Sequence, residues 1–385
     1  MKLSERHFIS INHQNYTEID DLSFKSKNLY NKANYIIRQE FTKNNKYINY
    51  VKLDKLMQKE PEYKLLPAKV SQGTLKLLDR NWSSFFAANK EFRKNPSKFK
   101  CSPKIPKYLD KANGRFALIY SIQAIKKDNK LSGTKIQVNT KRKTKEIRIV
   151  HKKFGYIIEV VYEKEELKQI NNENWLSIDI GVNNLCAITS NQLNNPILIN
   201  GRPLKSINQY YNKQLSLLKS EKKKQKAIKK RYFRIQNYFH KVSKLIIDLC
   251  SKNNISKIVI GHNNNWKQKV NLGKTNNQNF VYIPFNDLIQ KISYKAELSG
   301  INVIITEESY TSKASSLDED ELIKGTIFTG ERVKRGLYRK NNGEEINSDL
   351  NGSLNIARKV INVKADRSLV ARPLRVKNPY KHKFL

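Results

Sequence analysis

The second half of the chain alternates short apolar runs with long stretches of helical spacing. Residues 175–190, WLSIDIGVNNLCAITS, contain two apolar runs joined by a turn at Gly181–Asn184, which predicts a pair of β-strands. A basic stretch with helical spacing covers about 203–252, and the apolar runs 257–261 and 302–306 flank a predicted helix at 285–300. This order of strands and helices is typical of an α/β domain.

The first half shows strands around a block of helices. The run RHFISIN at 6–12 predicts a strand, and apolar residues at helical spacing predict helices over 24–46 and 70–92. Four apolar runs with alternating polar positions predict further strands, at 116–122, 134–139, 145–150 and 156–163. Pro103 and Pro106 mark a boundary because proline breaks a helix. We expect a small β-domain with a helical insertion.

The charge balance indicates a polyanionic partner. The 385 residues include 74 Lys and Arg against 34 Asp and Glu, a formal net charge of +40. A lysine-rich genome would raise the number of lysines but would not explain the scarcity of acids, so nucleic acid is the favoured partner. A membrane surface is the rival, but no run approaches the ~18 apolar residues of a membrane span.

The chain is expected to be soluble and intracellular. Its first residues, MKLSERHFISIN, lack the apolar core of a signal peptide. Three scattered cysteines argue against a disulfide framework: Cys101, Cys186 and Cys250.

Two aspartates stand at positions suited to metal chemistry. Asp179 interrupts an apolar strand, where a carboxylate is costly unless it is paired in an ion pair or binds a metal. Asp349 opens a predicted helix, where an aspartate alone is more often an N-cap. Together they have the arrangement of RNase H-like nucleases, which hold two Mg²⁺ ions about 4 Å apart. Oxygen-only ligands suit Mg²⁺.

With these residues in view, the chain resembles TnpB, the transposon-encoded RNA-guided nucleases related to type V CRISPR effectors. SIDIGVNN at 177–184 matches the first RuvC motif and SDLNGSLNIARK at 348–359 the third. RYFRIQNYFHKVSKLII at 231–247 and ESYTSKASSLD at 308–318 match the intervening helix and the zinc-finger entry.

The resemblance implies a fold that is part α/β and part β. It assigns a wedge-type β-barrel to 1–23 and 100–172, with a helical recognition insertion at 24–99. A RuvC-like nuclease domain of RNase H-like fold would follow at 173–310 and 343–362, interrupted by a zinc-finger insertion at 311–342. Residues 363–385 remain as a basic tail, expected to be loosely held.

The zinc finger departs from the family pattern. By spacing, its four cysteine positions hold Ser315, Asp318, Arg339 and Asn342. Serine and asparagine are poor zinc ligands and a guanidinium repels the ion, so no zinc is expected. We expect apolar packing to hold this segment instead, by Phe328, Leu337 and Tyr338.

The second departure is at the middle acid of the family, which aligns with Gly261. A nuclease-dead protein is one interpretation. In the other, the strand at 302–306 lies beside the strand ending at Gly261, about 4.8 Å away, and delivers a carboxylate into the space above the glycine. Because side chains alternate along a strand, only one of Glu307 and Glu308 should face that space, and we predict Glu308. Both acids could instead be solvated, and His262 is an auxiliary candidate.

We therefore predict that Asp179, Glu308 and Asp349 are the catalytic residues and hold two Mg²⁺ ions. The basic helical stretch at 219–234 is either a solvated face or a nucleic-acid surface. We favour the second, because Tyr232, Phe233 and Tyr238 are interleaved with cations. The predicted phosphate contacts are Lys229, Lys230, Arg231 and Arg234, with Lys104, Lys107 and Tyr108 in the first half.

The predicted function is that of an RNA-guided DNA endonuclease, with a guide RNA and target DNA as partners and base pairing reading the target. It would act in the bacterial or archaeal cytoplasm, at the nucleoid, as a monomer or a dimer. One alternative is a nuclease-inactive, RNA-guided DNA-binding repressor. A DNA-strand-transferring transposase is a second, but no nucleophilic Tyr or Ser stands out.

Overall fold

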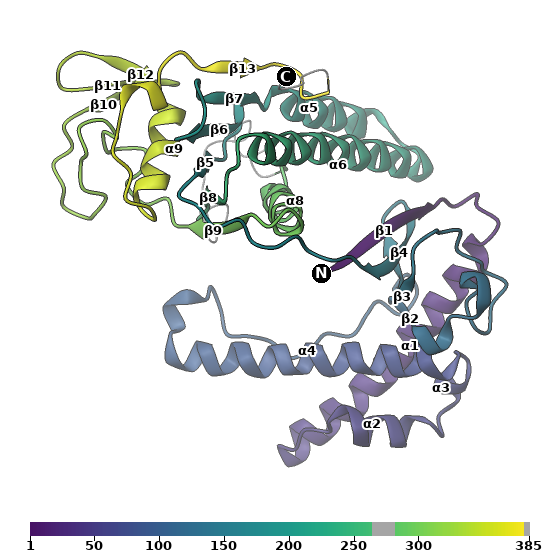
Figure 1. Ribbon diagram of the computed structural model, residues 1–385. Helices are drawn as coiled ribbons and strands as arrows, with labels where there is room; N and C mark the ends of the chain where they lie inside the picture. The colour runs from purple at the N-terminus through teal and green to yellow at the C-terminus, as the bar shows by residue number, and fades with distance from the viewer. Residues whose placement is uncertain (264–281, 381–385) are drawn as a thin grey trace. The chain divides into compact units, whose positions relative to one another are not determined.

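A computed structural model describes residues 1–263 and 282–380. The chain divides into two compact units, Met1–Lys164 and Glu165–Leu385, which are taken one at a time below (Figure 1). Residues 264–281 and the end of the expected basic tail, 381–385, lie outside the described residues.

The first unit contains an antiparallel sheet of four strands in the order β1-β4-β3-β2. Its strands are β1 (Lys2–Ile9), β2 (Leu118–Ser121), β3 (Thr144–Lys152) and β4 (Gly155–Glu163). Strands β1 and β2 are its edges, so the sheet is open and does not form the expected closed barrel. The strand predicted at 134–139 is also wrong. Ile136 and Val138 are buried there, but the segment contributes only one isolated bridge, between Lys130 and Gln137.

Helices α1 (Tyr16–Asn44) and α4 (Ala68–Lys94) contact β2 of this sheet, and α2 (Tyr50–Met57) and α3 (Pro61–Lys64) pack on these two helices. Helix α1 begins eight residues before the predicted start at 24. Three short 3₁₀ turns complete the unit: η1 (Pro96–Lys98), η2 (Ile122–Ala124) and η3 (Lys127–Asn129). Trp82 is fully buried and stacks on Phe41, Phe85 and Phe86, so these aromatics form a helical core, as their spacing predicts.

The second unit is built on a six-stranded mixed sheet in the order β13-β7-β6-β5-β8-β9. Its strands are β5 (Trp175–Asp179), β6 (Asn184–Ser190), β7 (Ile197–Asn200), β8 (Lys257–Gly261), β9 (Asn302–Thr306) and β13 (Leu374–Val376). β5, β8 and β9 run parallel, as does β13 with β7, while β6 is antiparallel to both its neighbours.

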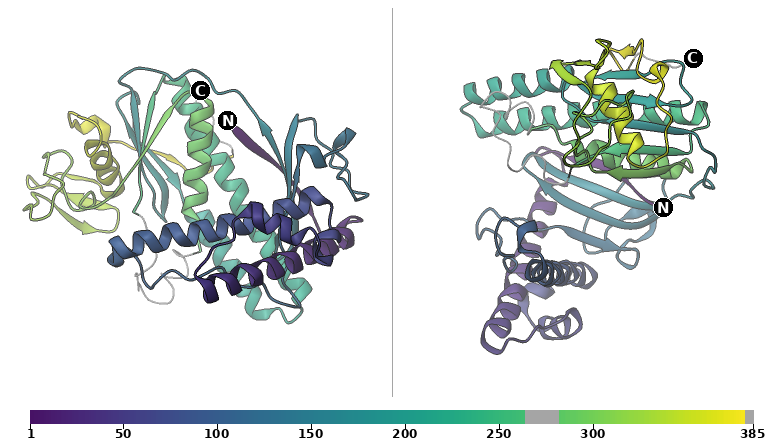
Figure 2. Two further views of the ribbon diagram at one scale, coloured as in Figure 1. Left: turned by 90° about the horizontal axis from the view of Figure 1, so that it is seen from below. Right: turned by 90° about the vertical axis from the view of Figure 1, so that its left-hand side faces the viewer.

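Helices cover both faces of this sheet. One face carries α6 (Glu221–Lys252) and α8 (Phe285–Leu298), with α5 (Arg202–Leu217) packed on α6, and the other carries α9 (Ser348–Arg358) (Figures 1 and 2). Alternation along β5 explains the layering: Leu176 and Ile178 join the core under α6 and α8, whereas Ser177 bonds to α9. The single predicted helical stretch at 203–252 is two helices, broken at 218–220.

Two smaller elements complete the unit. A three-stranded sheet precedes α9, in the order β10 (Glu331–Lys334), β11 (Leu337–Arg339) and β12 (Glu345–Asn347). After α9 comes the 3₁₀ turn η4 (Arg367–Leu369) and then β13. The expectation of a loose tail is therefore wrong for 370–376, because Val370 and Val376 are buried and β13 pairs with β7. Among the described residues, no helix is both apolar and long enough to span a bilayer.

Candidate active site

Asp179 is the last residue of β5 and points to the side of the sheet that α9 covers. Helix α9 approaches β5 closely because only small side chains separate them. The Ser177 hydroxyl donates to the Ser353 carbonyl at 2.7 Å, and the Ser353 hydroxyl donates to the Ser177 carbonyl at 3.0 Å. A Cβ on Gly352 would lie 3.0 Å from Oδ2 of Asp179, so the glycine leaves room for this carboxylate.

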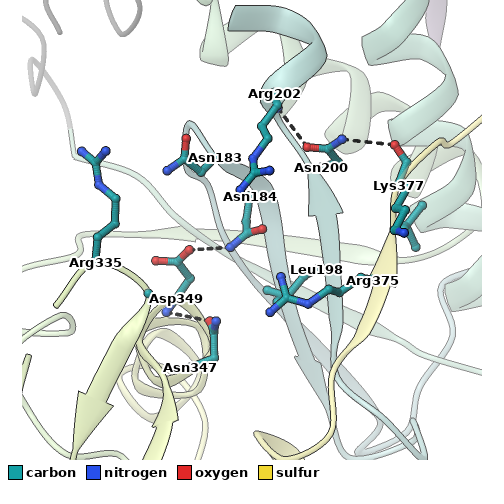
Figure 3. A pocket seen from close by; sticks show the side chains of 12 residues that line it. Asn183, Asn184, Leu198, Asn200, Arg202, Arg335, Asn347, Asp349, Arg375 and Lys377 are labelled. Atoms are coloured by element: carbon teal, nitrogen blue, oxygen red, sulfur yellow. Dashed lines mark hydrogen bonds between the residues drawn. The ribbon is translucent and has the colours of Figure 1, made fainter. Parts of the chain in front are cut away.

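Asp349 lies in the first turn of α9, and Asn347 caps the helix. The Asn347 side chain accepts hydrogen bonds from the amides of Asp349 and Leu350 at 3.0 and 3.2 Å. The capping role considered for Asp349 is thus wrong, and its carboxylate is available for other contacts. Oδ2 accepts a hydrogen bond from Asn184 at 2.7 Å, and Oδ1 lies 3.7 Å from the guanidinium of Arg332 (Figure 3).

Glu308 follows β9, which pairs with β8 so that Gly261 stands opposite Thr306. A Cβ on Gly261 would lie 2.8 Å from Cγ and 2.9 Å from Oε1 of Glu308, so this side chain occupies the space above the glycine. Oε1 is buried and has no hydrogen-bond partner in the described part of the chain. Glu307 is exposed, and its carboxylate accepts a hydrogen bond from Ser309.

The electrostatics connect the three acids. Burial, and then the negative charges of Glu308 and Asp349, raise the pKa of Asp179 well above its usual value, while Arg332 opposes the shift. Burial raises the pKa of Glu308 to about 7, against the influence of Lys359. A buried carboxylate whose pKa is raised by neighbouring acids, as that of Asp179 is, favours a bound cation, and a proton takes this place in the absence of a metal.

Side chains of α9 hold the segment after Glu308 in place. Asn355 donates to the carbonyls of Thr311 and Ala314 at 3.0 and 2.8 Å, and Asn351 donates to that of Ala314 at 2.8 Å. Lys359 donates to the carbonyl of Glu307 at 3.1 Å. One helix therefore presents Asp349 at its start and fixes the backbone that carries Glu308 near its end.

The donor set suits a hard divalent cation. All three side chains offer only oxygen, which Mg²⁺ prefers, and Glu308 supplies a buried oxygen that lacks a partner. Within residues 1–263 and 282–380, no three His, Cys, Asp or Glu side chains form a cluster that could close around one ion. A site built from these acids would be completed by groups outside the protein, as Mg²⁺ usually is, because it keeps several waters.

A basic pocket of about 560 Å³ opens beside Asp349 (Figure 3). The pocket is lined by Asn183 of the loop between β5 and β6 and by Asn184 at the start of β6. The cations that line the pocket are Arg202, Arg335, Arg375 and Lys377. Sequence analysis missed these four cations. The alternation in LRVK at 374–377 was a signal, because a buried Val376 places Arg375 and Lys377 together on the opposite face.

Comparison with known proteins identifies the relatives of this chain. Residues 159–267 match a family model described as a probable transposase, OrfB_IS605, and residues 285–356 match the Cas12f1-like TNB domain. These two matches support a relation of the chain to the TnpB and type V effector family.

Two curated relatives of the family are similar to this chain. The CRISPR-associated endodeoxyribonuclease Cas12f2 of a Micrarchaeota archaeon is 27% identical over 311 residues, which cover 76% of this chain and 55% of the relative. Cas12f1 of Sulfoacidibacillus thermotolerans is 34% identical over 119 residues, 31% of this chain and 25% of the relative. The chain thus spans about half the length of the first relative and a quarter of the second.

A cryo-EM structure of a Cas12f1-sgRNA-target DNA complex aligns with 94% of this chain and all of that chain. The TM-score is 0.39 at 15% sequence identity.

The segment that resembles the family's zinc finger is held by polar contacts. The Ser315 hydroxyl donates to Asp318 at 2.6 Å, and the ammonium of Lys340 lies 3.2 Å from Asp318 and 3.4 Å from Glu344. Arg339 pairs with Glu345, and Asn342 accepts a hydrogen bond from the amide of Glu344. Of the three residues expected to pack there, Tyr338 is fully buried, while Phe328 and Leu337 are half-buried.

The predicted phosphate contacts on α6 differ in accessibility. Lys230 and Arg234 are exposed and line a groove between α5 and α6, and Lys229 is half-buried. Arg231 has a structural role instead. Its guanidinium donates to Asn208 at 2.8 Å and to the carbonyl of Tyr282 at 2.6 Å, and it stacks on Tyr211. Tyr238 does not lie on the predicted nucleic-acid surface either, because it is buried and its hydroxyl donates a hydrogen bond to the carbonyl of Asn200.

Of the remaining predicted residues, three lie at the surface of the first unit, and His262 lies next to Gly261 at the end of β8. Lys104, Lys107 and Tyr108 are exposed in the first unit, and the ring of Tyr108 lies 4.5 Å from the guanidinium of Arg38. His262 directly follows β8, and its backbone amide donates to the carbonyl of Thr306 at 2.8 Å.

Proposed function

We propose that this protein is an RNA-guided DNA endonuclease whose second unit is a RuvC-type nuclease of RNase H-like fold. Asp179, Glu308 and Asp349 would be its catalytic acids. Similarity to the TnpB and type V effector family supports the guide RNA and the DNA target as partners. The observation that carries the proposal is the Glu308 side chain over Gly261, because it puts a carboxylate where the family's middle acid is absent.

The metal would be Mg²⁺, held by the oxygens of these three acids. When bound, two Mg²⁺ ions would supply Lewis-acid activation of water and neutralise charge at the phosphate. The chain's own groups orient the acids: Asn184 fixes the Asp349 carboxylate by its 2.7 Å hydrogen bond, and Lys359 fixes the backbone next to Glu308. Zinc is not expected in the 311–342 segment, where a lysine already lies between two acids.

Nucleic-acid binding would involve exposed cations in both units. We propose phosphate contacts for Lys229, Lys230 and Arg234 on α6, where Tyr210 and Tyr211 line the same groove as two of them. In the first unit, Lys104, Lys107 and Tyr108 would contact the nucleic-acid backbone from the proposed wedge region. Such contacts carry no base specificity, which the guide would supply by pairing with the target.

The experiment is a cleavage assay with the protein, its guide RNA and matched DNA. Cutting is expected in Mg²⁺ and not in EDTA. Glu308→Gln should reduce the rate by at least about a hundredfold, since removing one charge-stabilising group costs 10²–10³ in other enzymes. Glu307→Gln is the matched control, because this neighbour is exposed and its carboxylate accepts a hydrogen bond from Ser309. Normal cutting by Glu308→Gln together with loss in Glu307→Gln would move the assignment by one residue.

The nuclease-inactive repressor is the second candidate. It is favoured by the glycine at the middle acid's position and by the lack, among the described residues, of a three-ligand metal cluster. The same assay separates the two functions. If the wild-type complex binds matched DNA in Mg²⁺ and never cuts it, the repressor is the correct function.

A further inference from the structure

The segment 372–377 is fixed along the edge of the second unit's sheet. The Asn195 side chain donates to the carbonyl of Arg372 at 3.1 Å, and the Asn200 side chain donates to that of Lys377 at 3.3 Å. Between these anchors, the amide of Leu374 donates to the carbonyl of Pro196 at 2.8 Å and β13 pairs with β7. The backbone here is held by residues about 180 positions earlier in the chain.

This anchoring places two cations at the mouth of the pocket beside Asp349. Val376 is 1% exposed, so Arg375 and Lys377 on either side of it point outward. Arg375 and Arg202 extend toward Asn184, the partner of Asp349, from different elements (Figure 3). In the part of the chain that the structure describes, Arg202, Arg335, Arg375 and Lys377 form no ion pair with a carboxylate.

A second pocket, of about 730 Å³, continues along the same segment. It shares Gly336, Asn347 and Arg375 with the first pocket and adds Arg367 and Arg372. Arg367 is paired with Glu344 at 2.6 Å. The two pockets therefore form one basic groove, with residues 367–377 as a wall and Asp349 at one end.

Unpaired cations that face one cavity repel each other until an anion lies between them, and guanidinium groups match phosphate with two parallel hydrogen bonds. A groove that passes from one pocket into the next suits a row of phosphates better than a single small anion. We propose that residues 372–377 bind the phosphates of the DNA strand that reaches Asp349, mainly through Arg375 and Lys377. This inference rests on the proposed function.

The test compares Arg375→Ala/Lys377→Ala with Lys364→Ala. Both substituted cations of the double variant are exposed and the anchoring bonds of this segment use the backbone, so β13 should form normally. Lys364 is a matched control because it is an exposed cation on the same C-terminal segment but lines neither pocket. All variants carry Asp179→Asn, so that binding is measured without cutting. Affinity for matched DNA with the guide RNA, and for an unguided single-stranded DNA oligonucleotide, is measured against salt.

The double variant should bind both DNAs about tenfold more weakly near physiological salt. Its salt slope should be smaller by roughly two, one for each lost phosphate contact. Guide RNA affinity should match that of Lys364→Ala. DNA binding equal to that control overturns the proposal, as does a loss confined to guide RNA. This test measures binding and not cutting. A wild-type protein that never cuts DNA would therefore refute the endonuclease but would leave the comparison of the variants valid. If the complex with guide RNA fails to bind matched DNA, the affinities for the unguided single-stranded DNA still decide the proposal.

Discussion

Oε1 of Glu308 lies 2.9 Å from the point that a Cβ on Gly261 would occupy. Gly261 ends β8, and Glu308 lies two residues after the end of the neighbouring parallel strand β9, whose Thr306 is aligned with Gly261. The glutamate can fold back over the sheet only because its neighbour has no side chain. The position of the Glu308 side chain therefore requires a glycine at residue 261.

Gly261→Ala should lower the free energy of unfolding by about 1–3 kcal/mol, the usual cost of an extra carbon in a packed site. The new Cβ would lie 2.4 Å from Cδ1 of Ile356 and 2.8 Å from Cγ of Glu308. Adding Ile356→Val deletes the first of these atoms and should recover part of the stability. Gly261→Ala should also slow cleavage, because the new Cβ displaces Glu308. Cleavage should stay slow in the double variant Gly261→Ala/Ile356→Val, because Glu308 is still displaced.

Urea unfolding and single-turnover cleavage measure the two effects. The control is Ile356→Val alone, which should cost about 0.5–1.5 kcal/mol. If Gly261→Ala cuts DNA at the wild-type rate, Glu308 does not need the space above the glycine.

The metal-free protein should become less stable as pH rises from about 4.5 to about 7. Burial raises the pKa of Glu308 to about 7, from 4.5 for an ordinary glutamate. Between these values the folded chain holds a proton at this site that the unfolded chain has lost, so the free energy of unfolding falls with pH. The contribution of Glu308 is on the order of 3 kcal/mol, at 1.36 kcal/mol per unit of pKa.

Urea unfolding in EDTA at several pH values measures this slope. Glu308→Gln should reduce it, since the amide cannot ionise, while the raised pKa of Asp179 leaves part of the slope. Mg²⁺ should also reduce it in the wild type, because the ion takes the place of the proton. Parallel curves for wild type and Glu308→Gln would show that Glu308 does not titrate in this range.

The sequence pattern was a good guide where local alternation decides the outcome. The run at 175–179 alternates, so the strand and the face that carries Asp179 were both predictable. The neighbouring strands 257–261 and 302–306 also made the approach of Glu308 to Gly261 predictable, because the distance between parallel strands is fixed. Whether Glu308 binds a metal stays a prediction.

The pattern failed where partners are distant in sequence. β13 looked like part of a loose tail because its edge partner β7 lies about 180 residues earlier. Arg231 looked like a surface cation until the fold brought Asn208 and the carbonyl of Tyr282 to it. For Asp349 the sequence allowed an N-cap or a metal ligand, and only the structure shows that Asn347, two residues earlier, is the cap. An amino-acid sequence shows the type of each residue, but not which residues distant in the chain will contact it.

Gly352→Ala should separate catalysis from stability. Alanine in a helix is more stable than glycine by about 1 kcal/mol, so the melting temperature should hold or rise. The new Cβ would lie 3.0 Å from Oδ2 of Asp179, closer than carbon and oxygen normally approach, so the carboxylate must move. We expect cleavage to fall by about tenfold to a hundredfold, the cost of a small misplacement at a reacting centre.

Thermal unfolding, guide RNA binding and cleavage are compared between Gly352→Ala and wild type. Unchanged guide binding shows that the first steps of assembly are intact. If the variant cuts normally, the position of Asp179 is not critical and the site must be reconsidered.

Lys340 should stabilise the 315–345 segment in the way that a metal would. Only 11% of its side chain is exposed, and its ammonium lies 3.2 Å from Asp318 and 3.4 Å from Glu344. Lys340→Met keeps the apolar stem but leaves the partly buried Asp318 without its cation and Glu344 with Arg367 alone, so the free energy of unfolding should fall by about 1–3 kcal/mol. Arg339→Met is the control next door: its partner Glu345 is exposed, and such surface pairs contribute about 0–1 kcal/mol. A zinc chelator should leave the wild-type melting temperature unchanged. A clear drop with the chelator, or equal stability of the two variants, would mean that this lysine does not replace a metal.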